Sequence, residues 1–201
     1  MTGRPTRHLA AAALLATLAG PAAADDWPGP RVMNVFSEDG GHFARITPGG
    51  SYGESVGFAG APKGPHARAE FYRRTPDSSY ARVADIRLEN PVAPVEALVS
   101  NSGHLLTLDN WHNAGYGSVV VIYDPSGKMV TAWPLERLYD ARHIEKLTHS
   151  VSSRWWRCAA HGYVDPVEQT RVYVTERLGG NFVFELATGT FTYSPGAATC
   201  P

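Results

Sequence analysis

Three histidines lie in segments of the sequence that are predicted to be loops: His66, His112 and His161. Three neutral imidazoles with one open coordination position could hold a zinc ion and activate water for hydrolysis. Asp109 or Asp165 could then orient one of the imidazoles through its second nitrogen. The sequence contains neither HxH nor HExxH, the spacings that place metal ligands on one element. No metal or other cofactor is therefore expected, and a metal-dependent or carboxylate-dependent hydrolase is the alternative hypothesis.

Nucleophilic residue types are better explained by structural roles. The sequence has no GxSxG turn, the motif that presents a serine nucleophile. Its two cysteines, Cys158 and Cys200, form no CxxC motif and belong to a chain with features of an exported protein, so we expect them to form a disulfide. Paired catalytic carboxylates on separate loops would leave no sequence pattern. These observations favour a binding module over an enzyme.

Aromatic residues beside glycines are the stronger indication of function. In the stretch NWHNAGYG, Trp111 and Tyr116 accompany Gly115 and Gly117. Aromatic side chains on such loops are suited to recognise a sugar ring, a peptide or a protein surface. The alternative is that Trp111 folds back over the end of the core, since large aromatic residues are usually buried. The predicted binding residues are Tyr52, Asp109, Trp111, His112 and Tyr116.

Alternating apolar residues predict four consecutive strands in the middle of the chain. The turn sequences NSG and DPSG separate the first pair and the last pair of these strands. Pro134 suits a first helical position, and apolar residues then recur at helical spacing, so one short helix is expected over 134–147. The strands are expected at 95–100, 104–109, 118–123 and 128–133.

The same order of strands recurs before and after this unit, with His42 in the first copy at the position of His104 in the second. A Gly-, Pro- and Ser-rich insertion at 48–66 separates the second and third strands of the first copy. In the third copy the segment CAAHGYVDPVEQT is expected to be a loop. The first copy's strands are expected at 31–36, 41–46, 68–73 and 80–88, and the third copy's at 150–158, 170–175, 181–187 and 190–193.

The repeated pattern is a strand that ends in serine, a polar turn with glycine, apolar alternation and an aspartate, followed later by VVVIYDPSGKMVTAW. It resembles the four-stranded blades of exported β-propellers, although its motifs belong to no one propeller family. The resemblance implies an all-β fold of about three antiparallel blade-like repeats, at 31–90, 95–148 and 149–194. Since three blades do not close a ring, we expect an open fan. The alternatives are a ring completed by a second chain and a β-sandwich.

The first residues have the pattern of a secretory signal peptide. Arg4 and Arg7 precede an apolar run and the triplet Ala22-Ala23-Ala24, so residues 1–24 are expected to be removed. We therefore expect a secreted or periplasmic protein with a single β domain at 25–201 and no membrane span. The formal net charge of −1 argues against a nucleic-acid partner. The expected partner is a protein, peptide or carbohydrate, and an open repeat edge could also pair with a second copy as a homodimer.

Overall fold

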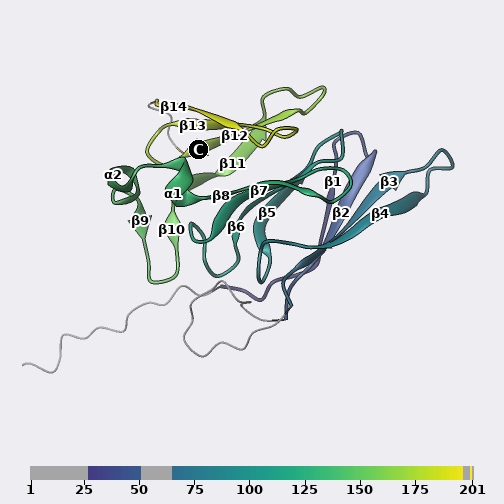
Figure 1. Cartoon of the computed structure of the whole chain (residues 1–201), viewed down its shortest axis with the longest axis horizontal. Coiled ribbons are helices and arrows are strands. Elements are labelled where there is room, and N and C mark those ends of the chain that lie inside the picture. Colours follow the sequence, from purple (N-terminus) through teal and green to yellow (C-terminus); the bar gives the residue numbers. More distant parts are fainter. Residues whose placement is uncertain (1–26, 51–64, 197–199, 201) are drawn as a thin grey trace, which may run out of the picture.

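The computed structural model describes residues 27–50, 65–196 and 200, and most of its regular structure is β-strand. Three four-stranded antiparallel sheets follow one another along the chain, each with its strands in sequence order. Figure 1 shows these sheets side by side as an open fan. The predicted all-β fold with about three four-stranded repeats is therefore confirmed, and the sheets do not form a two-layer sandwich.

Each of these sheets is a meander of neighbouring strands. The first sheet contains β1 (Met33–Phe36), β2 (His42–Thr47), β3 (Arg68–Arg74) and β4 (Tyr80–Arg87). The second sheet contains β5 (Pro94–Val99), β6 (Leu105–Asn110), β7 (Ser118–Tyr123) and β8 (Met129–Pro134). The third sheet contains β11 (Arg157–Tyr163), β12 (Arg171–Glu176), β13 (Asn181–Glu185) and β14 (Phe191–Ser194). In the first two sheets the predicted strands begin and end within two residues of the observed ones.

The repeated serine and Gly-His motif forms the same turn in the first two sheets. In the β1–β2 turn, the Ser37 N–H donates to the His42 carbonyl at 2.9 Å, and the His42 N–H donates to the Ser37 hydroxyl at 2.9 Å. In the β5–β6 turn, Ser100 and His104 make the same two bonds, both at 3.0 Å. Gly103 has a φ of 84°, a conformation that favours glycine. These serines and histidines are therefore explained by turn structure.

The second sheet is buried on both of its faces. One core lies between the first and second sheets and includes Phe71 and Val121. A second core lies between the second and third sheets and includes Ile122, Trp156 and Phe182. All six residues of β6 are buried, as expected for a strand in a sheet that is covered on both faces.

The outer face of the first sheet carries exposed ion pairs and, beside them, a row of aromatic rings that includes Phe36, which is 54% exposed. Arg68 Nη2 lies 2.7 Å from Asp85 Oδ1, and Arg82 Nη1 lies 2.8 Å from Glu70 Oε1. These ion pairs are exposed to solvent, and a ring closed by a second chain would bury them at a desolvation cost.

The segment 134–147 differs from the single helix that the sequence predicts. It forms two one-turn helices, α1 (Leu135–Leu138) and α2 (Ala141–Ile144). Tyr139 between them is extended, and the Asp140 side chain caps α2 by accepting from the His143 N–H at 2.8 Å. Aspartate competes with continuous helix in this way because its short side chain bonds the nearby backbone. The apolar residues at helical spacing still reach the second core: Leu135, Leu138, Tyr139 and Leu147.

The third sheet begins later than the sequence predicts. Strands β9 (Thr148–His149) and β10 (Arg154–Trp155) form a separate hairpin, and β11 takes up much of the segment expected to be a loop. This strand was missed because its sequence, RCAAHGY, is small and polar and lacks apolar alternation. His161 and Tyr163 therefore lie in a strand, and not in a loop between the second and third strands of a repeat.

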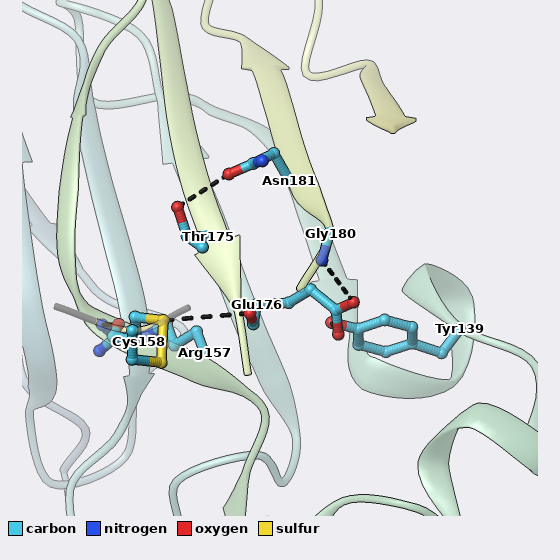
Figure 2. Close-up of a disulfide and its surroundings, with 8 residues drawn as sticks. Tyr139, Arg157, Cys158, Thr175, Glu176, Gly180 and Asn181 are labelled. Atoms are coloured by element: carbon cyan, nitrogen blue, oxygen red, sulfur yellow. Dashed lines mark hydrogen bonds between the residues drawn. A yellow bond between two sulfur atoms is a disulfide. The ribbon is translucent and has the colours of Figure 1, made fainter. Parts of the chain in front are cut away.

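The predicted disulfide between Cys158 and Cys200 is present (Figure 2). It attaches the C-terminal segment to β11, in which the Cys158 side chain is buried. Within the described residues, no helix is long and apolar enough to cross a membrane. The predicted signal peptide at 1–24 and the predicted binding residue Tyr52 lie outside the described residues.

A buried glutamate beside the disulfide connects the third sheet to the helical segment. Figure 2 shows Tyr139 and Gly180 directed at the carboxylate of Glu176, which is only 1% exposed. Burial acts to raise the pKa of Glu176, but the bonds it accepts from the Gly180 N–H and from nearby side chains outweigh burial and hold that pKa below its usual range. Its contacts are Gly180 N at 2.9 Å, Tyr193 OH at 2.9 Å, Tyr139 OH at 3.1 Å and His143 Nε2 at 3.2 Å.

Candidate functional site

The loop between β6 and β7 contains most of the predicted binding residues. The Asn110 side chain holds the loop closed by donating to the Tyr116 carbonyl at 2.7 Å. Asp109 and His112 have φ values of 59° and 68°, a region that non-glycine residues seldom adopt. Strained backbone of this kind persists only where the surroundings impose it, and it is frequent at binding sites. Residues 111–117 therefore form a rigid loop with a constrained shape.

The carboxylate of Asp109 is the centre of this constraint. Its Oδ1 accepts from the Gly115 N–H at 3.0 Å and from the Trp156 indole N–H at 2.7 Å. Its Oδ2 accepts from Arg157 Nε at 2.7 Å. Asp109 is 3% exposed, so both oxygens are directed into protein. This carboxylate therefore joins the β6–β7 loop to the third sheet.

Arg157 is shared between Asp109 and a second carboxylate. Its Nη1 donates to Glu96 Oε2 at 2.9 Å, and His161 Nδ1 lies 3.0 Å from the same oxygen without the alignment of a hydrogen bond. Burial acts to raise the pKa of Glu96, but His161 and the charge of Arg157 outweigh burial and hold that pKa below its usual range. Both carboxylates are thus engaged by donors of the protein, Glu96 by Arg157 and Asp109 by Gly115, Trp156 and Arg157.

The loop also packs against the β9–β10 hairpin. The Arg154 N–H donates to the Ala114 carbonyl at 2.8 Å, and a Cβ on Gly115 would lie 2.3 Å from the Arg154 carbonyl oxygen. Only glycine fits at this position, because its φ is also 77°. The Arg154 guanidinium carbon lies 4.2 Å from the centre of the Tyr116 ring, and its Nη1 lies 2.7 Å from Glu136 Oε1. Tyr116 is therefore held by a cation–π contact.

A cleft of about 210 Å³ opens between the second and third sheets beside this loop. Sites for drug-sized molecules usually enclose about 300–1,000 Å³, so the cleft is the size of a side chain. Arg177 at its edge is exposed and forms no ion pair with another described residue. The polar and aromatic lining of the cleft consists of Glu96, Asp109, Arg154, Trp155, Trp156, Arg157 and Arg177.

Three tryptophans from distant parts of the sequence meet next to the cleft. The ring centre of Trp27 lies 5.5 Å from that of Trp111 and 6.3 Å from that of Trp155, with which it is stacked. His112 lies 5.8 Å from Trp27, and burial lowers its pKa. We refer to the surface formed by Trp111, His112 and Trp155, on which Trp27 lies, as the tryptophan face. These three residues and Trp27 are all half-buried, so none of them is closed off from solvent.

The structure brings four of the predicted binding residues together: Asp109, Trp111, His112 and Tyr116 all lie in or beside the same loop. Trp111 is half-buried and packs against Trp27. The residues that sequence reasoning missed are those contributed by other elements, namely Trp27, Glu96, Trp155 and Arg157. Trp155 and Arg157 belong to the stretch RWWRC, in which Trp155 is half-buried and Trp156 lies in the core.

The three histidines of the alternative metal site are not brought together. Within residues 27–50, 65–196 and 200, no three His, Cys, Asp or Glu side chains are grouped so that they could hold a metal ion. His66 is buried and its Nδ1 bonds the Leu88 carbonyl at 3.1 Å. His112 packs on Trp27, and His161 lies beside Glu96. The described structure therefore gives no group that matches the alternative set of His66, His112 and His161.

No protein-family model matches this sequence, and no curated protein matches it. Among solved structures, a similar chain is that of "Crystal structure of HIRA(644-1017)", with a TM-score of 0.38 and 10% sequence identity. The similarity covers 83% of this chain and 56% of that one, so this chain spans little more than half of that chain's length. At this score the similarity carries no conclusion about function.

Proposed function

We propose that this protein is a non-enzymatic recognition module that binds an extended segment of a partner protein on the tryptophan face. The observation that carries the proposal is that Trp111 and Trp155, from two separate segments and each partly exposed, both contact one further aromatic ring, that of Trp27. Tryptophan is enriched among the residues that dominate protein–protein binding energy. Partly exposed rings in contact with one another form a surface that a partner's apolar side chains would cover.

The rigidity of the β6–β7 loop supports the same function. The Asp109 carboxylate and the Asn110 amide fix the loop backbone before any ligand arrives. A surface that is already ordered loses less conformational entropy on binding, and this increases affinity. The adjacent cleft would accept one side chain of the bound segment, and the exposed Arg177 at its edge would favour an acidic residue there.

We propose further that the protein acts outside the cytoplasm as a single β domain over residues 25–201. The signal-peptide pattern at 1–24 and the Cys158–Cys200 disulfide both support export, since disulfides persist in oxidising compartments. In such a compartment the disulfide would keep the C-terminal segment attached to β11.

Replacing Trp111 with alanine is expected to abolish recognition while the fold is retained. Peptides of 12 residues would be selected from a displayed random library against the unsubstituted protein, and the affinity of the best peptide would be measured by fluorescence anisotropy. Trp111→Ala should lower the affinity for that peptide by about 30-fold or more, as is usual for the loss of a central aromatic contact. Phe36→Ala is the matched control, because Phe36 is an aromatic residue on the first sheet that is 54% exposed. The Phe36→Ala protein should bind the peptide with unchanged affinity.

Two results would contradict the proposed function. The first is a Trp111→Ala protein that binds the selected peptide as tightly as the unsubstituted protein does. The second is a Trp111→Ala protein that does not fold, which would identify Trp111 as a core residue. Trp111→Phe keeps most of the ring contacts, so this variant should fold and lose only part of the affinity.

A further inference from the structure

The chain places its own N-terminal segment on the tryptophan face. In Figure 1 the segment that precedes β1 runs past the edge of the second sheet. The ring of Trp27 lies within 5.5–6.3 Å of three rings, those of Trp111, His112 and Trp155. The Trp111 indole N–H donates to the Pro28 carbonyl at 3.0 Å. Residues 27 and 28 thus occupy the surface that the proposed function assigns to a partner.

This segment is held by side chains and not by strand pairing. Residues 27–30 form no backbone hydrogen bond with another described residue. Pro28 and Pro30 lack an N–H and fix their own φ, so the segment cannot join a sheet as a regular strand. Gly29 is exposed, and a Cβ built on it would meet no atom within 4 Å. Its release would therefore break side-chain contacts and the bond from Trp111 but no strand pairing.

The geometry points to a specific ligand chemistry. We propose that the tryptophan face binds an extended partner segment in which an aromatic residue, best tryptophan, is followed by proline, and that residues 27–30 are an internal occupant which this segment displaces. This inference rests on the proposed function. A proline-containing segment is pre-ordered in an extended conformation, so it loses little entropy on binding. The aromatic ring of that segment would take the place of the Trp27 ring. The carbonyl of the proline that follows would accept a hydrogen bond from Trp111 Nε1.

The internal segment would act as a competitor because it is part of the same chain. A tethered segment has an effective concentration in the millimolar range. A free peptide of the same sequence would therefore bind weakly to the unsubstituted protein and more tightly when the internal tryptophan is removed. Export of the protein would leave this competition intact, since the predicted cleavage after residue 24 retains Trp27.

The experiment uses the whole chain with Trp27→Ala and the synthetic peptide DDWPGPRV, which has the sequence of residues 25–32. Binding would be measured by isothermal titration calorimetry. The Trp27→Ala protein is expected to bind the peptide about tenfold or more tightly than the unsubstituted protein does. The peptide DDAPGPRV should bind neither protein. Adding Trp111→Ala to Trp27→Ala should abolish the gain, whereas adding Phe36→Ala should not affect it.

Equal affinity of DDWPGPRV for the Trp27→Ala and unsubstituted proteins would overturn the inference. So would a DDAPGPRV peptide that binds the Trp27→Ala protein as tightly as DDWPGPRV does. A Trp27→Ala protein with a substantially lower urea midpoint would overturn it as well, because Trp27 would then be part of the core. If library-selected peptides bind in a manner that depends on Trp111 but DDWPGPRV does not bind, the inference fails and the proposed function stands. If selected peptides bind independently of Trp111, the proposed function itself fails.

Discussion

Replacing Asp109 with alanine is expected to lower the free energy of unfolding by about 4 kcal/mol, the largest effect of any single side chain in the site. The substitution leaves the Arg157 guanidinium, which is 7% exposed, without one of its two carboxylate partners. It also leaves the Trp156 indole N–H and the Gly115 N–H without their acceptor. An uncompensated buried charge and unsatisfied buried donors are each costly. Urea unfolding at neutral pH measures the change.

Two further variants make this result specific. Asp109→Asn keeps one oxygen acceptor and the side-chain volume, so its unfolding midpoint should fall between those of the unsubstituted protein and Asp109→Ala. Asp85→Ala removes an aspartate from an exposed ion pair with Arg68 and should have little effect on the midpoint. If Asp109→Ala and Asp85→Ala unfold alike, the buried network does not hold the β6–β7 loop in place.

Removing the disulfide is expected to lower the free energy of unfolding by a similar amount, but through a different mechanism. Cys158 and Cys200 are 42 residues apart, and a cross-link of that length lowers the entropy of the unfolded chain by an equivalent of about 4 kcal/mol. The Cys158→Ala, Cys200→Ala protein should therefore retain its native circular dichroism spectrum but unfold at a lower urea concentration. The unsubstituted protein treated with a reducing agent should behave in the same way. Unfolding that is insensitive to reduction would show that the C-terminal segment contributes nothing to stability.

Much of the fold could be predicted from local sequence patterns. The strands of the first two sheets follow from apolar alternation and from turn sequences such as NSG and DPSG, because the burial of one sheet face and the geometry of a short turn are local properties. The equivalence of His42 and His104 was also visible, and the two turns do share their hydrogen bonds. By contrast, β11 pairs through its backbone while its side chains are small or polar, so no apolar pattern marks it.

The site could be predicted only in part, and the reason is again physical. Trp111 and Tyr116 were found because aromatic residues beside glycines are unusual in a short loop. The network around Asp109 depends on contacts across sequence separations of 47 and 48 residues, to Trp156 and Arg157. Contacts between sheets depend on how the sheets pack and leave no spacing in the sequence. For the same reason nothing in the sequence indicated that Trp27 joins the site. Its neighbour Pro28 lies 83 residues before Trp111, from which it accepts a hydrogen bond.

Amide hydrogen exchange would show directly whether the partner binds on the tryptophan face. Exchange would be compared in the unsubstituted protein with and without the best library-selected peptide. We expect slower exchange in the bound protein at residues 111–117 and 154–157, the loop and hairpin that surround the face and its cleft, and no change in β3 and β4 of the first sheet. Protection confined to β3 and β4, with none at 111–117, would contradict it.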